Sequence, residues 1–227
     1  MKTLALIMTL SIAAFTSLAA ENCARKRVVA CVGDSITYGH GASNRRVTSY
    51  PAKLQSLLGN DWAVTNLGHN ARTAINEGME WNKAKGMGYC KSPRYKQSLE
   101  CKPDYVIFML GTNDSKGVNW DEEVFRRDYT ALVDSYLALD PKPVVIIGIS
   151  PFVKKDSFSI REKIVGGSIA PWQREFAAKR SLPAVDAYSV MKENAAKGYL
   201  GDGVHPNDAG YAALAEAFAA KIRSLEK

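Results

Sequence analysis

The sequence has few of the residues from which metal centres are built. It holds only three histidines and four cysteines among its 227 residues, with no Cys-x-x-Cys pair and no His-Glu-x-x-His motif. Structural and catalytic zinc sites draw their ligands from such residues at close spacing. We therefore expect no metal and no cofactor.

Long hydrophobic runs are also missing beyond the N-terminus, since a membrane-spanning helix needs about 20 apolar residues in succession. Residues 1–20 combine a basic second residue, an apolar stretch over 4–14 and small residues at the end, which is the pattern of a secretory signal peptide. A lipid anchor on Cys23 is less favoured, because the two residues before it are not small. We expect no stable membrane insertion, an exported (periplasmic or extracellular) protein, and one domain over 21–227.

The sequence lacks a basic stripe with interleaved aromatic residues. Its formal net charge is +7, and the densest basic patches are 25–27 and 83–96. No nucleic-acid reader motif accompanies them, so no nucleic-acid partner is expected. Solvated surface explains the charge, and attraction to an anionic substrate is the alternative.

The four cysteines are interpreted for an oxidising compartment, where disulfides persist. Cys90 and Cys101 bracket a short segment and are predicted to form a disulfide. Cys31 lies in a predicted central strand and is expected to be a buried free thiol. Cys23 cannot easily reach it, because a strand advances by about 3.3 Å per residue.

Short β-branched runs alternate with longer segments of helical character. The runs predicted as strands cover 27–32, 63–67, 105–110, 144–149 and 184–187. The segments predicted as helices cover 48–58, 122–139, 160–180 (broken or kinked by Gly166-Gly167 and Pro171) and a last helix with Pro206 in its first turn. Strand-helix alternation with nearly continuous apolar strands predicts an α/β fold, a three-layer α/β/α sandwich around a five-stranded parallel sheet.

Polar residues follow several of these strands at one edge of the predicted sheet. Ser35 follows the first strand in "GDS", Gly68 ends the second in "NLG", and Asn113 follows the third in "GTND". Asp202 and His205 stand three residues apart in "DGVHP" before the last helix. Each motif alone suits an ordinary turn. Together they supply a nucleophile, a base, an orienting acid and oxyanion donors.

The ordered blocks "GDSITYG", "NLG", "GTND" and "DGVHP" resemble those of the SGNH hydrolases, also called GDSL esterases or lipases. The resemblance runs from about residue 27 to the C-terminus and implies a flavodoxin-like SGNH hydrolase fold. It implies Ser35 as nucleophile, His205 as base and Asp202 as the orienting carboxylate. The N–H groups of Ser35 and Gly68 and the side chain of Asn113 would form the oxyanion hole.

His40 and His69 are the rival bases. Neither has a carboxylate at a defined offset, whereas His205 has Asp202, so His205 is preferred. Asp34 is interpreted as a residue that fixes the turn before Ser35.

The segment 73–100 is polar, basic and aromatic, unlike the apolar lid expected of a lipase. We predict substrate contacts from the residues that follow Gly68 and from nearby aromatic residues: His69, Arg72, Trp81, Tyr95 and Trp172. The alternative for the two tryptophans is that they fill the edge of the core.

The blocks "SYPAKLQSLLG" and "MLGTNDSKGVNW" also resemble the exported carbohydrate O-acetylesterases, including proteins similar to sialate O-acetylesterases. This resemblance implies a serine esterase whose partner is a small-molecule or polysaccharide acyl ester, with sialic acid and polysaccharides as candidate carriers of the acetyl group. Two alternatives stay open: an exported lysophospholipase or thioesterase-like hydrolase, and a carbohydrate-binding relative without catalysis.

Overall fold

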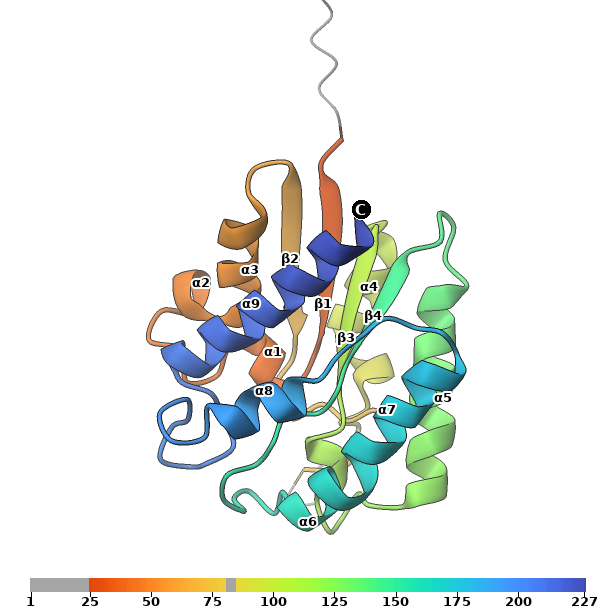
Figure 1. Ribbon diagram of the computed structural model, residues 1–227. Coiled ribbons are helices and arrows are strands. Elements are labelled where there is room, and N and C mark those ends of the chain that lie inside the picture. Colours follow the sequence, from red (N-terminus) through yellow and green to blue (C-terminus); the bar gives the residue numbers. More distant parts are fainter. Residues whose placement is uncertain (1–24, 81–84) are drawn as a thin grey trace, which may run out of the picture.

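The computed structural model describes residues 25–80 and 85–227 and contains one five-stranded sheet (Figure 1). Its strands are β1 (Arg27–Gly33), β2 (Trp62–Gly68), β3 (Tyr105–Met109), β4 (Val144–Gly148) and β5 (Ala184–Val185). All neighbouring pairs are parallel, in the order β2-β1-β3-β4-β5. The predicted sheet is confirmed.

This strand order places a switch of direction between β1 and β3. The chain moves outward from β1 to β2 and then crosses back to β3 on the other side of β1. In open α/β sheets, ligands bind at such a switch point, beyond the carboxyl ends of the strands. The segments that follow β1 and β3 are therefore the ones best placed to form a site.

Helices cover both faces of the sheet (Figure 1). One face carries α3 (Tyr50–Leu58), α8 (Ala187–Glu193) and α9 (Asp208–Leu225). The other carries α4 (Pro93–Glu100), α5 (Glu122–Leu137) and α7 (Ala170–Lys179). The shorter elements are α1 (Ser35–Tyr38), α2 (Arg45–Thr48), η1 (Tyr89–Lys91), η2 (Asn113–Ser115), α6 (Glu162–Ile164) and η3 (Val165–Ile169).

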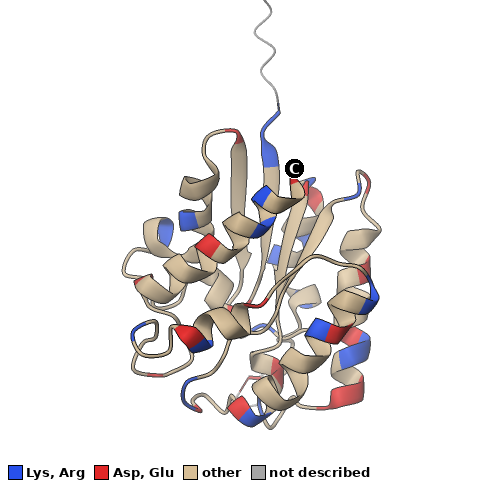
Figure 2. Cartoon of the chain, viewed as in Figure 1, with Lys and Arg blue, Asp and Glu red and all other residues tan. Residues whose placement is uncertain are grey.

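The central strands are apolar on both sides because both faces are covered. In β1, Val29 and Cys31 face the layer of α3 and α9, while Ala30 and Val32 face the layer of α5 and α7. Cys31 is fully buried and unpaired, as predicted, and burial raises the pKa of its thiol far above the ordinary value. A thiol in this state is unreactive. Charged residues lie mainly on the outer helices and loops (Figure 2).

The predicted disulfide between Cys90 and Cys101 is wrong for this structure, in which both thiols are free. Helix α4 fills the segment between them, with Cys101 as its C-terminal cap. A helix advances about 1.5 Å per residue, so the two ends lie farther apart than the roughly 7 Å between Cα atoms that a disulfide tolerates. Instead, Cys90 donates to Asn76 Oδ1 at 3.1 Å and Cys101 to the Ser98 carbonyl at 3.3 Å.

One predicted helix is interrupted at its glycines as expected, and the last helix begins later than predicted. The segment 160–180 divides into α6, the π-helical turn η3 and α7, with Gly166 and Gly167 inside η3 and Pro171 in the first turn of α7. The last helix begins at Asp208 rather than around Pro206, because the side chain of Asn207 caps it by accepting the N–H groups of two helix residues. Its apolar side chains are buried against the sheet: Tyr211, Leu214, Ala215, Phe218, Ala219 and Ile222.

None of the helices within the described residues is both long and apolar enough to cross a bilayer. The predicted signal peptide, Cys23 and Trp81 lie outside the described residues. Export therefore stays a prediction from the sequence.

Candidate active site

Ser35 stands at the sharp turn from β1 into α1. Asp34 caps that helix, its Oδ1 accepting the N–H of Ile36 at 2.9 Å, which is the turn-fixing role expected of it. The turn is tight, since a Cβ on Gly33 would lie 2.1 Å from Thr37 Oγ1. Glycine at this position lets the strand and helix pack closely and places the Ser35 hydroxyl at the carboxyl edge of the sheet.

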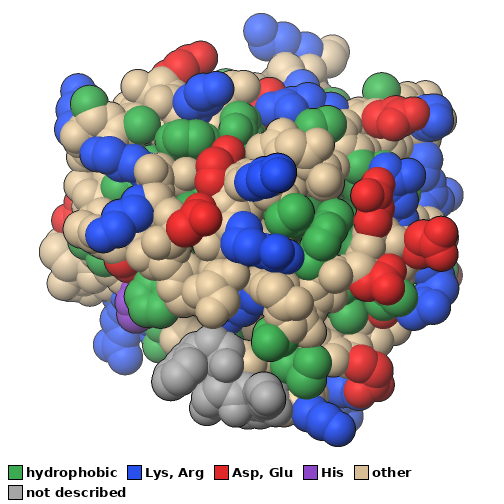
Figure 3. Space-filling model, turned by 90° about the horizontal axis from the view of Figure 1, so that it is seen from below, with side chains coloured by type: hydrophobic (Ala, Val, Ile, Leu, Met, Phe, Trp, Pro, Cys, Tyr) green, Lys and Arg blue, Asp and Glu red, His purple; other side chains and the backbone are tan. Residues whose placement is uncertain are grey.

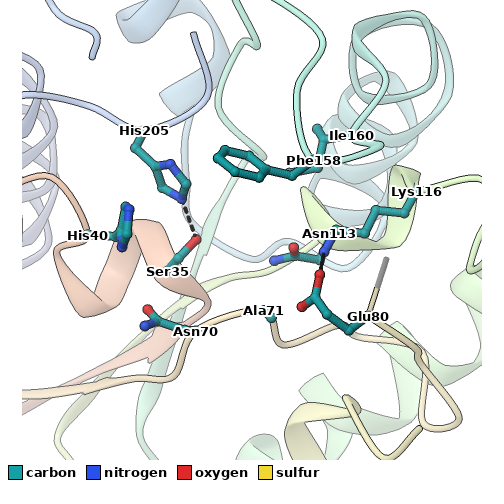
Figure 4. Close-up of a pocket in the computed structure, with 10 residues that line it drawn as sticks. All are labelled: Ser35, His40, Asn70, Ala71, Glu80, Asn113, Lys116, Phe158, Ile160 and His205. Atoms are coloured by element: carbon teal, nitrogen blue, oxygen red, sulfur yellow. Dashed lines mark hydrogen bonds and ion pairs between the residues drawn. The ribbon is translucent and has the colours of Figure 1, made fainter. Parts of the chain in front are cut away.

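His205 connects Ser35 (Figure 4) to Asp202 through two hydrogen bonds. The Ser35 Oγ lies 3.0 Å from His205 Nε2, and His205 Nδ1 lies 2.8 Å from Asp202 Oδ2. A carboxylate only accepts, so it selects the tautomer that carries the proton on Nδ1. Nε2 is then the acceptor for the serine proton, which is the arrangement of a nucleophile with its base.

Asp202 and His205 lie in a loop before α9, and a tight turn brings their side chains together. Asp202 Oδ1 accepts the N–H groups of Val204 and His205, both at 2.9 Å. One carboxylate oxygen therefore shapes the loop while the other orients the imidazole ring. A side chain that bonds the backbone two and three residues later is typical of an Asx-turn.

The electrostatics around His205 favour a neutral base. Burial lowers the pKa of His205 below its ordinary value of 6.5, and the hydrogen bond and charge of Asp202 offset this only in part. Nearby His40 and Lys116 lower it further. For Asp202, burial alone would raise the pKa, but the hydrogen bonds from His205 and Val204 outweigh it and lower the pKa. At neutral pH the pair is a neutral imidazole and a carboxylate.

Asn113 lies beside Ser35, as its place after β3 predicted (Figure 4). Its Nδ2 donates to Asp34 Oδ2 at 3.3 Å and to the Arg72 carbonyl at 3.2 Å. Both distances are at the long end of the hydrogen-bond range. The two hydrogen bonds orient the carboxamide next to Ser35. A negatively charged oxygen at this place would accept a stronger hydrogen bond from Asn113 Nδ2.

Gly68 is not placed for the role that the sequence assigned to it. Its N–H donates to Asn66 Oδ1 at 3.0 Å, and Gly68 is absent from the residues that line the pocket around Ser35. A Cβ there would lie 2.1 Å from the backbone nitrogen of Tyr38. Glycine at this position therefore allows β2 to pack against α1.

Ala71, three residues farther on, does line the pocket. It adopts a left-handed conformation with φ of 61°, which is uncommon for alanine. Within the described residues its N–H donates to no other backbone group. Ala71 could not be predicted as a pocket residue, because an alanine in a sequence does not indicate a positive φ.

His69 and Arg72 support the loop that carries Ala71 and are not among the residues that line the pocket. His69 Nδ1 lies 2.6 Å from Ser92 Oγ, and Arg72 Nη2 lies 3.3 Å from His69 Nε2. Arg72 Nη1 donates to the Gly86 carbonyl at 2.7 Å. Burial, followed by the charges of Arg72 and Arg94, lowers the pKa of His69, so that its Nε2 is free to accept from the guanidinium.

Tyr95 and Trp172 also lie away from the pocket lining. Tyr95 makes edge contacts with Tyr89 and Tyr136 at ring-centroid distances of 6.2 and 6.1 Å. Trp172 packs against an aromatic cluster of α5 and α7 that includes Phe125 at 5.4 Å. For Trp172 the alternative reading holds, in which the ring fills the edge of the core.

The pocket around Ser35 is small, with a volume of about 210 Å³. Its lining residues are Ser35, His40, Asn70, Ala71, Glu80, Asn113, Lys116, Phe158, Ile160 and His205. Lys116 and Glu80 form a buried ion pair at the end away from His205 (Figure 4). Figure 3 views the molecule from the side of this edge, where basic, acidic and hydrophobic side chains are interspersed. Glu80, Lys116 and Phe158 were not among the predicted site residues, although Lys116 lies in the block "MLGTNDSKGVNW".

One group among the described residues has potential metal-ligand atoms close together. It consists of His40, Asp202 and His205, whose atoms lie within 4.8 Å of one another. Two of the three already bond each other and Ser35. The His40 ring lies against the His205 ring with centroids 4.3 Å apart, so it flanks the base and does not replace it.

Residues 31–213 match the model of the GDSL-like lipase/acylhydrolase family. The chain belongs to this family. It is 34% identical to the acetylxylan esterase of Xylanibacter ruminicola, over 86% of this chain and 43% of that protein. The chain thus spans less than half the length of this relative.

Two solved structures share the fold. The aryl esterase of M. smegmatis superposes with a TM-score of 0.70 at 23% identity, covering 88% of this chain and 99% of that one. A carbohydrate acetylesterase family member from Sinorhizobium meliloti gives 0.69 at 22% identity, covering 88% and 98%.

Proposed function

We propose that this GDSL-family protein is a serine esterase that removes O-acetyl groups from carbohydrates. The observation that carries the proposal is the pair of hydrogen bonds that joins Ser35 to His205 and His205 to Asp202 at a small pocket. The likeness to an acetylxylan esterase supports the acetyl group and the carbohydrate.

In the proposed reaction, the Ser35 Oγ attacks the ester carbonyl carbon while His205 Nε2 takes the hydroxyl proton. The tetrahedral intermediate then collapses, and His205 returns that proton to the departing alcohol oxygen. Water attacks the acetyl-enzyme with the same base, releasing acetate and restoring Ser35. Asp202 holds the ring in the required tautomer and stabilises the imidazolium formed in each half-reaction.

The oxyanion is assigned three donors: the N–H groups of Ser35 and Ala71 and the side chain of Asn113. Ala71 takes the place first given to Gly68, whose N–H is already bonded to Asn66. A donor of this kind is typically worth about 3 kcal/mol in the transition state. The Arg72 carbonyl and Asp34 hold the Asn113 carboxamide near the position it needs.

A short acyl group follows from the size and polarity of the pocket. Its volume of about 210 Å³ is below the roughly 300–1,000 Å³ of sites for drug-sized ligands. The departing alcohol must lie beside His205, so the acyl carbon points away from it, toward Glu80 and Lys116. A long alkyl chain would have to cover this ion pair and remove its remaining hydration.

Acetate release from acetylated xylan, acetylated mannan and O-acetylated sialic acid tests the proposal, with p-nitrophenyl acetate and palmitate as reporters of acyl length. We expect acetate from at least one carbohydrate and far faster turnover of the acetyl reporter. Faster turnover of palmitate would favour the lysophospholipase-like alternative, and no turnover of any ester would favour a non-catalytic binding protein.

We also propose that the enzyme acts after export, because residues 1–20 have the pattern of a signal peptide. Fractionation of cells that express the full chain, with N-terminal sequencing of the product, tests this. A cytoplasmic protein that retains Met1 would contradict it.

A further inference from the structure

Residues Ser157–Ile160 form a tight turn beside the active site. The Ile160 N–H donates to the Ser157 carbonyl at 2.9 Å, and the two residues also form an antiparallel bridge. Both central residues are left-handed, with φ of 55° at Phe158 and 62° at Ser159. This is the φ pattern of a type I′ turn, which strongly prefers Asn-Gly at these positions.

A phenylalanine is an unfavourable choice for the first central position of such a turn. Bulky residues with positive φ are genuine outliers, and strained backbone of this kind concentrates at functional sites. Packing does not explain the choice, because Phe158 is 49% exposed. It is the one aromatic ring among the large hydrophobic side chains that are exposed in the described part of the chain.

The turn is anchored to the element that carries Asn113. The Arg161 N–H donates to Ser115 Oγ at 3.1 Å, and Arg161 Nε donates to the Ser115 carbonyl at 2.9 Å. Ile160 is buried in a small cluster with Val153, Val165 and Val204. The position of the turn that carries Phe158 is therefore fixed relative to η2 and to the loop of His205.

The Phe158 ring lies beside His205, the residue that faces the departing alcohol in the proposed reaction. Its centroid is 5.7 Å from that of His205, at an interplanar angle of 61°, and both side chains line the pocket (Figure 4). His205 Nε2 must reach the departing oxygen to protonate it. Whatever is attached to that oxygen then passes beside Phe158.

We propose that Phe158 is the platform on which the ring of the alcohol part of the ester packs. A pyranose presents a face of C–H groups that suits an exposed aromatic surface, while its hydroxyls stay in water. That the alcohol is a sugar rests on the proposed function. That its ring packs on Phe158 rests on the conformation of the turn and on the contact between Phe158 and His205. The subsite selects for a cyclic alcohol over a small open-chain one.

The test compares a variant that removes the ring with one that keeps an aromatic ring and one that changes only the turn. Phe158→Asn places the preferred residue in the turn and removes the aromatic surface, whereas Phe158→Trp keeps such a surface. Ser159→Gly relaxes the turn and leaves the ring, so it is the matched control. Thermal unfolding of each variant reports on the fold.

The substrates are ethyl acetate, cyclohexyl acetate and an acetylated xylo-oligosaccharide, and the readout is the ratio of kcat/KM for each cyclic alcohol to that for ethyl acetate. We expect this ratio to fall at least tenfold in Phe158→Asn, mainly through KM, and less than threefold in Phe158→Trp and Ser159→Gly. An equal ratio in Phe158→Asn and the wild type, or a fall in Ser159→Gly as large as in Phe158→Asn, would overturn the subsite.

The two proposals fail in different ways. If the wild type releases acetate from none of the acetylated carbohydrates but the cyclohexyl-to-ethyl ratio falls in Phe158→Asn, the platform stands and the carbohydrate function is wrong. If the wild type deacetylates the oligosaccharide but no ratio changes in Phe158→Asn, the function stands and the platform is wrong.

Discussion

Lys116 Nζ lies 2.5 Å from Glu80 Oε1, and only 2% of the lysine side chain is exposed. Lys116 is the C-terminal cap of η2 and Glu80 lies in the loop after β2, so the ion pair joins these two segments at the end of the pocket, near Asn113. A cation buried this deeply is tolerated only with such a partner.

Replacing Lys116 with Met removes the cation and leaves the Glu80 carboxylate without this ion-pair partner. We expect the free energy of unfolding to fall by about 2–4 kcal/mol, measured by urea unfolding. The double variant Lys116→Met/Glu80→Leu should recover much of this loss. It should also raise the hexanoate-to-acetate ratio for p-nitrophenyl esters, because the end of the pocket becomes apolar. An unchanged ratio would mean that the ion pair does not limit acyl length.

Substitutions at Gly68 and Ala71 should have opposite effects on stability. Gly68→Ala should lower the melting temperature, since its Cβ would meet the backbone of Tyr38 at 2.1 Å. Ala71→Gly should stabilise the protein by about 1 kcal/mol by relieving the left-handed φ, with kcat retained because the N–H remains. A Gly68→Ala protein that melts like the wild type but loses kcat a hundredfold would restore Gly68 as the oxyanion donor.

Asn113→Ala should lower kcat by roughly a hundredfold or more while KM changes little, because the carboxamide acts on the charge that develops in the transition state. Asn119→Ala is a useful comparison, since Asn119 donates to the Asn113 carbonyl from outside the pocket lining. We expect it to affect stability more than kcat. Equal losses of kcat in both variants would argue for a structural role of Asn113.

The pH profile reports on His205, which must be neutral to accept the serine proton. The rate should therefore fall as pH drops through its pKa, and burial holds that pKa below 6.5. We expect the acid limb of kcat/KM to have its midpoint below pH 6.5. Removing the flanking imidazole in His40→Gln should move the midpoint upward, because His40 lowers the pKa of His205. A downward shift would contradict this account of the electrostatics.

The sheet and the convergence of Ser35, His205 and Asp202 could be predicted because their signals are local. Strands buried on both faces are continuous apolar runs, and each motif directly follows a strand or precedes the last helix. The disulfide was wrong because α4 separates the cysteines, although Ser92-Pro93 at its start is an ordinary helix-start signal. Ala71 and Phe158 could not be read from the sequence, since their roles depend on backbone conformations that their side chains disfavour.

The residues at the far end of the pocket were missed for a different reason. Lys116 and Glu80 are 36 positions apart, and only the path of the loop after β2 brings them together. The substrate contacts predicted for Tyr95 and Trp172 followed from residue type alone. Their rings pack against neighbouring aromatic rings instead.

The most direct test of the central claim is covalent labelling of the nucleophile. The protein is treated with diethyl p-nitrophenyl phosphate in the presence of EDTA, and the modified residue is located by peptide mass spectrometry. The account predicts a single diethylphosphoryl group on the Ser35 hydroxyl, loss of esterase activity in step with labelling, and much slower labelling in His205→Ala. Full esterase activity with Ser35 labelled, or labelling at another residue that abolishes activity while Ser35 stays free, would contradict it.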